Sequence, residues 1–152
     1  ITLVIIKALI VHVGSETFAI PLSSVLESLM ISRKEIKTIE GQEVIQLREH
    51  TLMLIRVKDL FKLESEESPQ EMLYVIVVGL VEKRMGLIVS DIRGQQEIVV
   101  KSLGEELKNL KGISGVTEIG DGKAVLVLDV AALIQEVTEK MEDAGVGTLQ
   151  ER

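Results

Sequence analysis

Short runs of valine, isoleucine and leucine, separated by polar or glycine-containing segments, recur along the whole chain. The first run, residues 1–13, carries a charge only at Lys7 and is rich in β-branched side chains. Such side chains fit a pleated, half-buried surface, so each run predicts a β-strand. Further strands are predicted at residues 17–20, 36–39, 43–48, 51–56, 72–78, 85–90, 98–101, 116–119 and 124–128.

Two glycine-containing segments predict reversals of the chain. Residues 93–96, Arg-Gly-Gln-Gln, separate the apolar arms of the stretch 86–104 and have the polarity of a turn. Residues 120–122, Gly-Asp-Gly, lie between two apolar runs and are a strong hairpin signal. Both segments therefore predict bends between neighbouring strands of a sheet.

Helices are predicted at only a few places. Val130, Leu133, Ile134, Val137 and Met141 recur at helical spacing, so residues 130–142 predict a C-terminal helix with one apolar face. Ser24 and Glu27 have the spacing of a capping box, which predicts a short helix at residues 25–30. A helical turn is expected at residues 57–61.

An acidic segment divides the chain into similar halves. Residues 64–71 have nothing to bury and carry repelling charges, so they predict a solvated linker. Residues 52–60 match residues 125–133, which indicates an internal duplication. We therefore predict an all-β fold of two small five-stranded barrels with short helices. The predicted parts of one domain, residues 1–142, are a long shared strand (1–13), a first barrel (mainly 14–63), the linker (64–71), a second barrel (mainly 72–129) and the C-terminal helix (130–142), followed by a flexible tail (143–152).

Barrels of this size bury little apolar surface by themselves. A domain of about 60 residues buries only about 60% of the surface that its unfolded chain exposes. We therefore expect the two barrels to share an apolar seam, with the strand at residues 1–13 joining them across it. An abrupt apolar start without methionine suggests a fragment of a longer polypeptide.

Composition excludes several classes of function. The formal net charge of −7 argues against a nucleic-acid surface, which needs clustered lysine and arginine. The chain has no cysteine, which excludes disulfides, thiolate metal sites and a cysteine nucleophile. The first apolar run is too short to span a membrane, which takes about 20 apolar residues. The cytoplasm is the expected compartment.

Several segments together resemble a known family, the CheW-like regulatory domain at the C-terminus of the bacterial chemotaxis histidine kinase CheA. The resemblance covers about residues 2–134, and residues 98–104, Ile-Val-Val-Lys-Ser-Leu-Gly, are its most specific part. The chain departs from the family pattern at Glu49, where a glycine is usual, and at Met53, where a proline is usual. The matching segments are residues 1–21, 44–48, 86–104 and 120–130.

The resemblance implies two SH3-like barrels that bind partners and have no catalytic function. It implies that the adaptor CheW and the cytoplasmic tips of chemoreceptors are the partners, that rings or arrays form with CheW at membrane-bound receptors, and that receptor state reaches the kinase through these contacts. By the resemblance, Leu9, Leu22, Val25 and Ile92 would line the receptor groove. The adaptor contacts would be Arg48, Glu49, Leu52, Leu54, Asp121, Val125 and Val127.

Two other interpretations remain open. The chain could be a free adaptor of the CheW type, or an enzyme with a site at the barrel seam that uses Asp91 and Arg93. No nucleophile, general base or cofactor motif accompanies that pair, so no catalytic, cofactor-binding or metal-binding residue is predicted. His12 and His50 have no partner residues at metal-ligand spacing and are interpreted as structural.

Overall fold

The computed structural model describes residues 3–63, 70–79, 83–103, 111–120 and 122–143, with the side chains of α2 described as far as residue 139. The fold is mainly β, as predicted. The predicted linker at 64–71 and the tail at 143–152 therefore lie largely outside the described residues. The hairpin predicted at Gly-Asp-Gly is confirmed, because β10 pairs antiparallel with β11 up to Ile119 with Lys123, and only Asp121 lies outside the described residues. The elements are β1 (Leu3–Val13), β2 (Glu16–Pro21), η1 (Leu22–Ser24), β3 (Val25–Ser32), η2 (Arg33–Glu35), β4 (Lys37–Ile39), β5 (Gln42–Leu47), β6 (His50–Arg56), α1 (Val57–Leu60), β7 (Met72–Gly79), β8 (Arg84–Val89), β9 (Asp91–Ser102), β10 (Ile113–Ile119), β11 (Lys123–Leu128) and α2 (Val130–Asp143).

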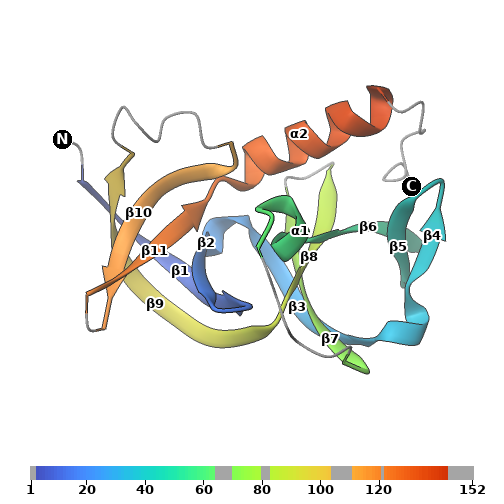
Figure 1. The fold of residues 1–152 in the computed structure, drawn as a ribbon, viewed down its shortest axis with the longest axis horizontal. Helices are drawn as coiled ribbons and strands as arrows, with labels where there is room; N and C mark the ends of the chain where they lie inside the picture. The colour runs from blue at the N-terminus through green and yellow to red at the C-terminus, as the bar shows by residue number, and fades with distance from the viewer. Residues whose placement is uncertain (1–2, 64–69, 80–82, 104–110, 121, 144–152) are drawn as a thin grey trace.

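The strands form a closed barrel and a second, strongly curved sheet (Figure 1). The closed barrel has the order β1-β2-β11-β10-β9, and the six-stranded sheet has the order β3-β7-β8-β6-β5-β4. Two parallel pairings, β2 with β11 and β6 with β8, join segments that are far apart in the sequence.

The boundary between the two sheets does not follow the boundary between the sequence halves. Strand β2 belongs to the barrel with β9, β10 and β11, whereas β7 and β8 lie between β3 and β6. Most strands within residues 14–63 lie in the six-stranded sheet, and β9, β10 and β11 lie in the barrel, but β2, β7 and β8 each join the sheet of the other half. Local periodicity reveals where strands are, but it carries no information about which distant strand each one joins.

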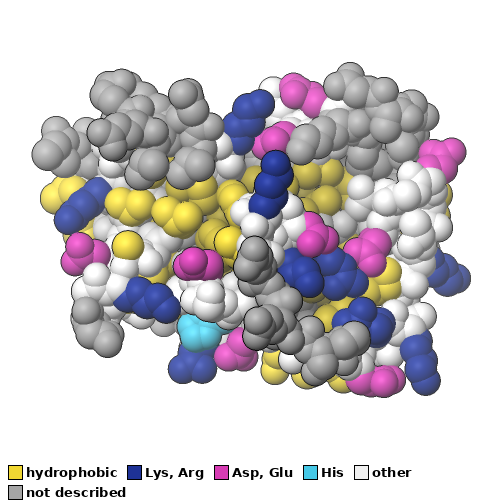
Figure 2. All heavy atoms as spheres, in the orientation of Figure 1, with side chains coloured by type: hydrophobic (Ala, Val, Ile, Leu, Met, Phe, Trp, Pro, Cys, Tyr) yellow, Lys and Arg dark blue, Asp and Glu magenta, His cyan; other side chains and the backbone are white. Residues whose placement is uncertain are grey.

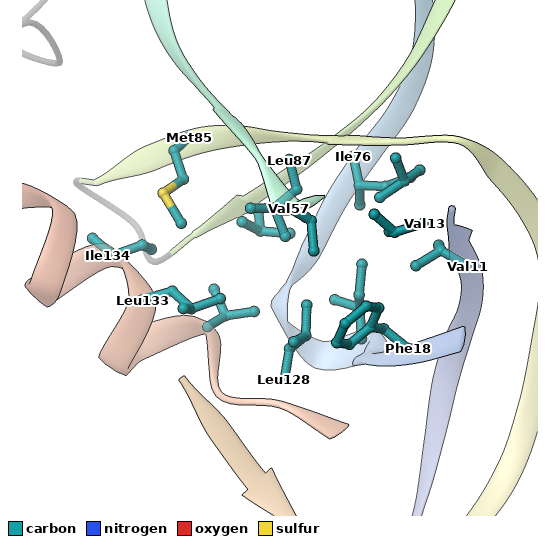
Figure 3. Packing of buried hydrophobic residues seen from close by; sticks show 14 of the residues in the cluster. Val11, Val13, Phe18, Val57, Ile76, Met85, Leu87, Leu128, Leu133 and Ile134 are labelled. Carbon is teal, nitrogen blue, oxygen red and sulfur yellow. The ribbon is translucent and has the colours of Figure 1, made fainter. Parts of the chain in front are cut away.

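The described residues form three apolar clusters, and the largest is the predicted seam. The seam cluster contains Val11 from the barrel, Leu87 from the six-stranded sheet and Leu133 from α2 (Figure 3). A second cluster fills the curved sheet and a third fills the barrel. The seam holds the two sheets together.

Strand β1 contributes to two clusters through its alternating side chains. Ala8 and Ile10 point into the barrel, whereas Leu9, Val11 and Val13 belong to the seam cluster. The strand hydrogen-bonds only to β2 and β9 among the described strands. The predicted shared strand thus joins the sheets by side-chain packing and not by pairing with both.

Helix α2 confirms the predicted C-terminal helix. Val130, Leu133, Ile134 and Val137 are buried in the seam cluster, so its apolar face closes one side of the seam. The Asp129 carboxylate accepts a hydrogen bond from the Ala132 amide at 3.1 Å, which caps the first turn. The side chain of Met141 lies outside the described residues.

Two local predictions are wrong. Residues 25–30 lie in β3, because a full row of pairs with β7 outweighs the capping pattern at Ser24. The capping box is formed instead at η2, between Ser32 and Glu35. Residues 93–96 continue through β9 without a reversal, and Gly94, at φ 124°, lies at a register shift opposite β1.

Candidate partner-binding site

The predicted groove residues all belong to the seam cluster or pack against it. Leu22 follows Pro21 in η1, Val25 begins β3, and Ile92 in β9 is paired with Val11. All three are partly buried and pack against the seam cluster, to which Leu9 belongs with 7% of its surface exposed. Leu9 is therefore almost fully buried, and the other three side chains are partly accessible. We call Leu22, Val25 and Ile92 the seam-edge surface.

An ion pair is formed by Glu27, which lies two residues after Val25 in β3. The Arg48 guanidinium donates two hydrogen bonds to the Glu27 carboxylate, from Nη1 to Oε2 at 3.0 Å and from Nη2 to Oε1 at 2.9 Å. The pair links β3 to the turn between β5 and β6. In that turn Arg48 itself adopts the positive φ, 57°, and Glu49 does not. The glycine that the family usually has after this arginine is therefore not needed for the turn that this chain forms.

We predict that the ion pair between Arg48 and Glu27 stabilises the folded chain at neutral pH and that this stabilisation is lost in acid. The two hydrogen bonds from Arg48 hold the pKa of Glu27 below its ordinary value in the folded chain. This contribution is therefore complete above the pKa of the unfolded chain, about 4.3, and disappears as the pH falls through the lower folded-state pKa. As the pH falls below about 4, the free energy of unfolding of Glu27→Gln should decrease less steeply than that of the wild type. Urea denaturation at a series of pH values measures this difference.

The control for this prediction is Glu49→Gln. It removes a carboxylate from the same turn without removing either partner of the pair. Its acid profile should match that of the wild type. Superimposable profiles for the wild type and Glu27→Gln would show that the pair does not contribute.

Four of the predicted adaptor contacts are buried inside the sheets. Leu52 and Leu54 belong to the cluster within the six-stranded sheet, and Val125 and Val127 belong to the cluster within the barrel. Each is at most 5% exposed. The prediction that they contact an adaptor directly is therefore wrong. An alternating pattern predicts a strand with two faces, but it does not tell which face points into a barrel.

The remaining predicted adaptor contacts differ in their accessibility. Arg48 and Glu49 are exposed at the turn between β5 and β6, where a partner can reach them. Asp121 lies outside the described residues. Near the buried residues Leu52 and Val125, the accessible positions are Thr51 and Ala124.

The sequence reasoning missed an exposed apolar patch on the six-stranded sheet. Leu26 and Met30 lie on the outer face of β3, and Met72 lies on the neighbouring strand β7, with 46%, 51% and 40% of their surfaces exposed. The exposed positions Leu26, Ser28 and Met30 alternate as in a strand, whereas the capping pattern at Ser24 predicts a helix over the same residues. On the face shown in Figure 2, apolar side chains also gather over β10 and β11, with charged side chains towards the margins. Apolar patches framed by charge are typical of protein interfaces.

Asp91 and Arg93 do not form a catalytic arrangement. Arg93 Nη1 lies 3.4 Å from Asp91 Oδ2 with both side chains largely exposed, and Asp91 Oδ1 accepts a hydrogen bond from the amide of Ile92. The carboxylate therefore bonds the adjacent backbone. Within the described part of the chain, no three histidine or acidic side chains lie close enough together to hold a metal ion. No described helix has the length and apolarity needed to cross a membrane.

Comparisons with known proteins agree with this architecture. A family model described as the CheW-like domain matches residues 7–138. Over 134 residues the chain is 47% identical to the sensor histidine kinase CheAY of Helicobacter pylori and 42% identical to the chemotaxis protein CheA of Bacillus subtilis, covering 88% of this chain in each case. The solved structure of the scaffolding protein CheW from Thermoanaerobacter tengcongensis has the same fold, with a TM-score of 0.64 at 18% identity.

The extent of these matches differs between the two kinds of relative. The matched regions are 17% and 20% of the two kinase-related proteins, so the chain spans about a fifth of their length. The fold comparison covers 83% of this chain and 90% of the scaffolding protein. Because the family model accounts for most of the chain, the chain belongs to the CheW-like domain family.

Proposed function

We propose that this chain is the non-catalytic interaction module of a chemotaxis histidine kinase and binds an adaptor of the CheW type and the cytoplasmic tips of chemoreceptors. The observation that carries the proposal is the seam-edge surface, an accessible aliphatic patch built by both sheets in a chain of this family. A helix presenting aliphatic side chains at intervals of three and four residues is the kind of ligand that such a surface fits.

The same family membership supports a role as a scaffold in the cytoplasm at membrane-bound receptor arrays. The kinase chemistry belongs in this proposal to other parts of a longer protein, because the matching region is only a fifth of the relatives' length. Changes at the surface would reach such a kinase through the shared seam. A receptor contact can therefore act on both sheets at once.

A free adaptor is the second candidate function. The observation in its favour is the fold comparison, in which this chain covers 90% of a chain that is described as a scaffolding protein. The two candidates differ in what the surrounding gene encodes. A reading frame that continues upstream into a kinase domain supports the first, and a reading frame that ends at this domain supports the second.

Calorimetric titration of this chain with a CheW adaptor and, separately, with a receptor-tip fragment tests the proposal. We expect both to bind the wild type. Charging the surface with Leu22→Asp should weaken the receptor interaction about tenfold or more, which corresponds to about 1.4 kcal/mol. The matched control is Val99→Asp, which charges an exposed apolar residue on the outer side of β9.

Circular dichroism spectra must show that both variants fold like the wild type. Equal weakening by Leu22→Asp and Val99→Asp would reject the seam-edge surface as the receptor site. A wild-type chain that binds neither partner would reject the proposed function as a whole.

A further inference from the structure

The closed barrel has an open end with a cavity of about 360 Å³. All five strands of the barrel contribute to its lining, and Ile10 and Ile119 supply apolar side chains. Thr17, which is only 6% exposed, supplies a hydroxyl. The cavity has the size of a small binding pocket. The rest of its lining is polar or cationic: His12, Arg93, Gly94, Gln95, Gln96, Gly120 and Lys123.

The cavity exists because two neighbouring strands of the barrel separate. Strands β9 and β10 are paired only at Ser102 with Gly115 and at Lys101 with Val116. From Arg93 to Val100, β9 pairs with β1 on one edge and with no described strand on the other. Backbone amide and carbonyl groups along such an edge are free to pair with an added strand.

Charge around the cavity selects for an anionic ligand. Arg93 and Lys123 are cationic, whereas no described lining residue is acidic. The side chains of His12, Gln96 and Lys123 have no hydrogen-bond or ion-pair partner among the described residues, and Arg93 has only the exposed contact with Asp91 at 3.4 Å. Among the described residues, only Asp91 therefore competes with a ligand for these side chains. The chain as a whole has a net charge of −7, so the cationic lining of this cavity differs in sign from the overall charge.

We propose that the open end of the barrel binds an extended acidic peptide. The peptide adds a strand along the free edge of β9, and one of its carboxylate side chains enters the cavity between Arg93 and Lys123. Main-chain hydrogen bonds then supply affinity, and the pocket for an alternate side chain supplies specificity. The free strand edge favours a peptide over a small anion, which would use the charges but not the edge.

The site is distinct from the seam-edge surface. It lies at the end of the barrel, and its apolar lining residues Ile10 and Ile119 belong to the barrel cluster or pack against it. The inference does not depend on the proposed function, since it can be tested with this chain and a short peptide alone. Failure of one proposal therefore leaves the other intact.

NMR titration of the nitrogen-15-labelled chain tests the site. The probe is a short capped peptide of valine and threonine with one central glutamate, and its partner differs only by glutamine at that position. We expect saturable shifts of the amides of Gly94, Gln96 and Gly120 with the glutamate peptide. We expect about tenfold weaker binding of the glutamine peptide, because a charge-assisted hydrogen bond is lost.

Variants of the chain distinguish the cavity from general attraction between charges. Lys123→Gln and Arg93→Gln should each weaken binding of the glutamate peptide about tenfold. Lys101→Gln removes the same charge from an exposed position of β9 outside the cavity and should leave binding unchanged. Equal weakening by all three variants would overturn the proposal, since it would indicate nonspecific attraction.

A third titration uses sodium acetate, which carries the carboxylate without a backbone strand. We expect acetate to bind at least tenfold more weakly than the glutamate peptide. Acetate binding as tight as that of the peptide would overturn the peptide proposal and would identify a small-anion site. Absence of saturable shifts with all three probes would overturn any ligand role for the cavity.

Discussion

Replacing Val125 with aspartate should unfold the protein and should not selectively remove one of its contacts. Val125 is 0% exposed and lies in the cluster that fills the barrel. A carboxylate there has no partner, and burying an unpaired charged or polar group costs several kcal/mol. Because the whole stability of a domain is roughly 5–15 kcal/mol, we expect most of the native circular dichroism signal to be lost or the urea midpoint to fall sharply.

The matched control is Ala124→Asp, one residue earlier in β11. Ala124 is exposed on the opposite face of the strand, so this variant should keep a stability close to that of the wild type. Leu52→Asp should unfold the six-stranded sheet for the same reason as Val125→Asp. A folded Val125→Asp variant with normal stability and a selective loss of adaptor binding would restore Val125 as a contact residue.

Phe18→Ala should destabilise both sheets together by about 3–5 kcal/mol, the usual cost of removing a buried phenylalanine ring. Phe18 is 1% exposed, belongs to the seam cluster and stacks on Phe61 with ring centroids 5.2 Å apart. Removal of the ring leaves a cavity between the barrel and α1. We expect one cooperative urea transition at a lower midpoint, with amide exchange accelerated in β1 and β7 alike.

A substitution confined to the barrel serves as the comparison. Ile98→Ala removes a buried side chain from the cluster within the barrel and leaves the seam cluster intact. It should accelerate exchange in β1 more than in β7. Faster exchange in β1 alone for Phe18→Ala would show that the seam does not couple the two sheets.

The strands and the C-terminal helix could be predicted because each has a strong local pattern. β-branched runs locate β1, β7 and β11, and the spacing of Val130, Leu133 and Val137 locates α2. The seam was predictable from size alone, because two small barrels need further apolar surface to bury. Leu22, Val25 and Ile92 followed from the family resemblance, and all three are partly buried side chains packed against the seam cluster.

The errors arise where long-range pairing outweighs local signals. Ser24 and Glu27 have the spacing of a helix cap, yet β3 gains a full row of pairs with β7. Gly94 signals a turn, yet β9 continues because β1 pairs with it on both sides of the irregularity. The inward orientation of Leu52 and Val125 depends on how each sheet curls, which no short segment of sequence determines.

The insertion of β7 and β8 between β3 and β6 has a consequence for dividing the molecule. A break between Leu63 and Gln70 would leave β1 to β6 on one piece and β7 to β11 on the other. Each piece would lack strands from both sheets, so neither could fold without its complement. Expressed as separate polypeptides, the two pieces should behave as an obligate pair and could be fused to other proteins as a complementation tag.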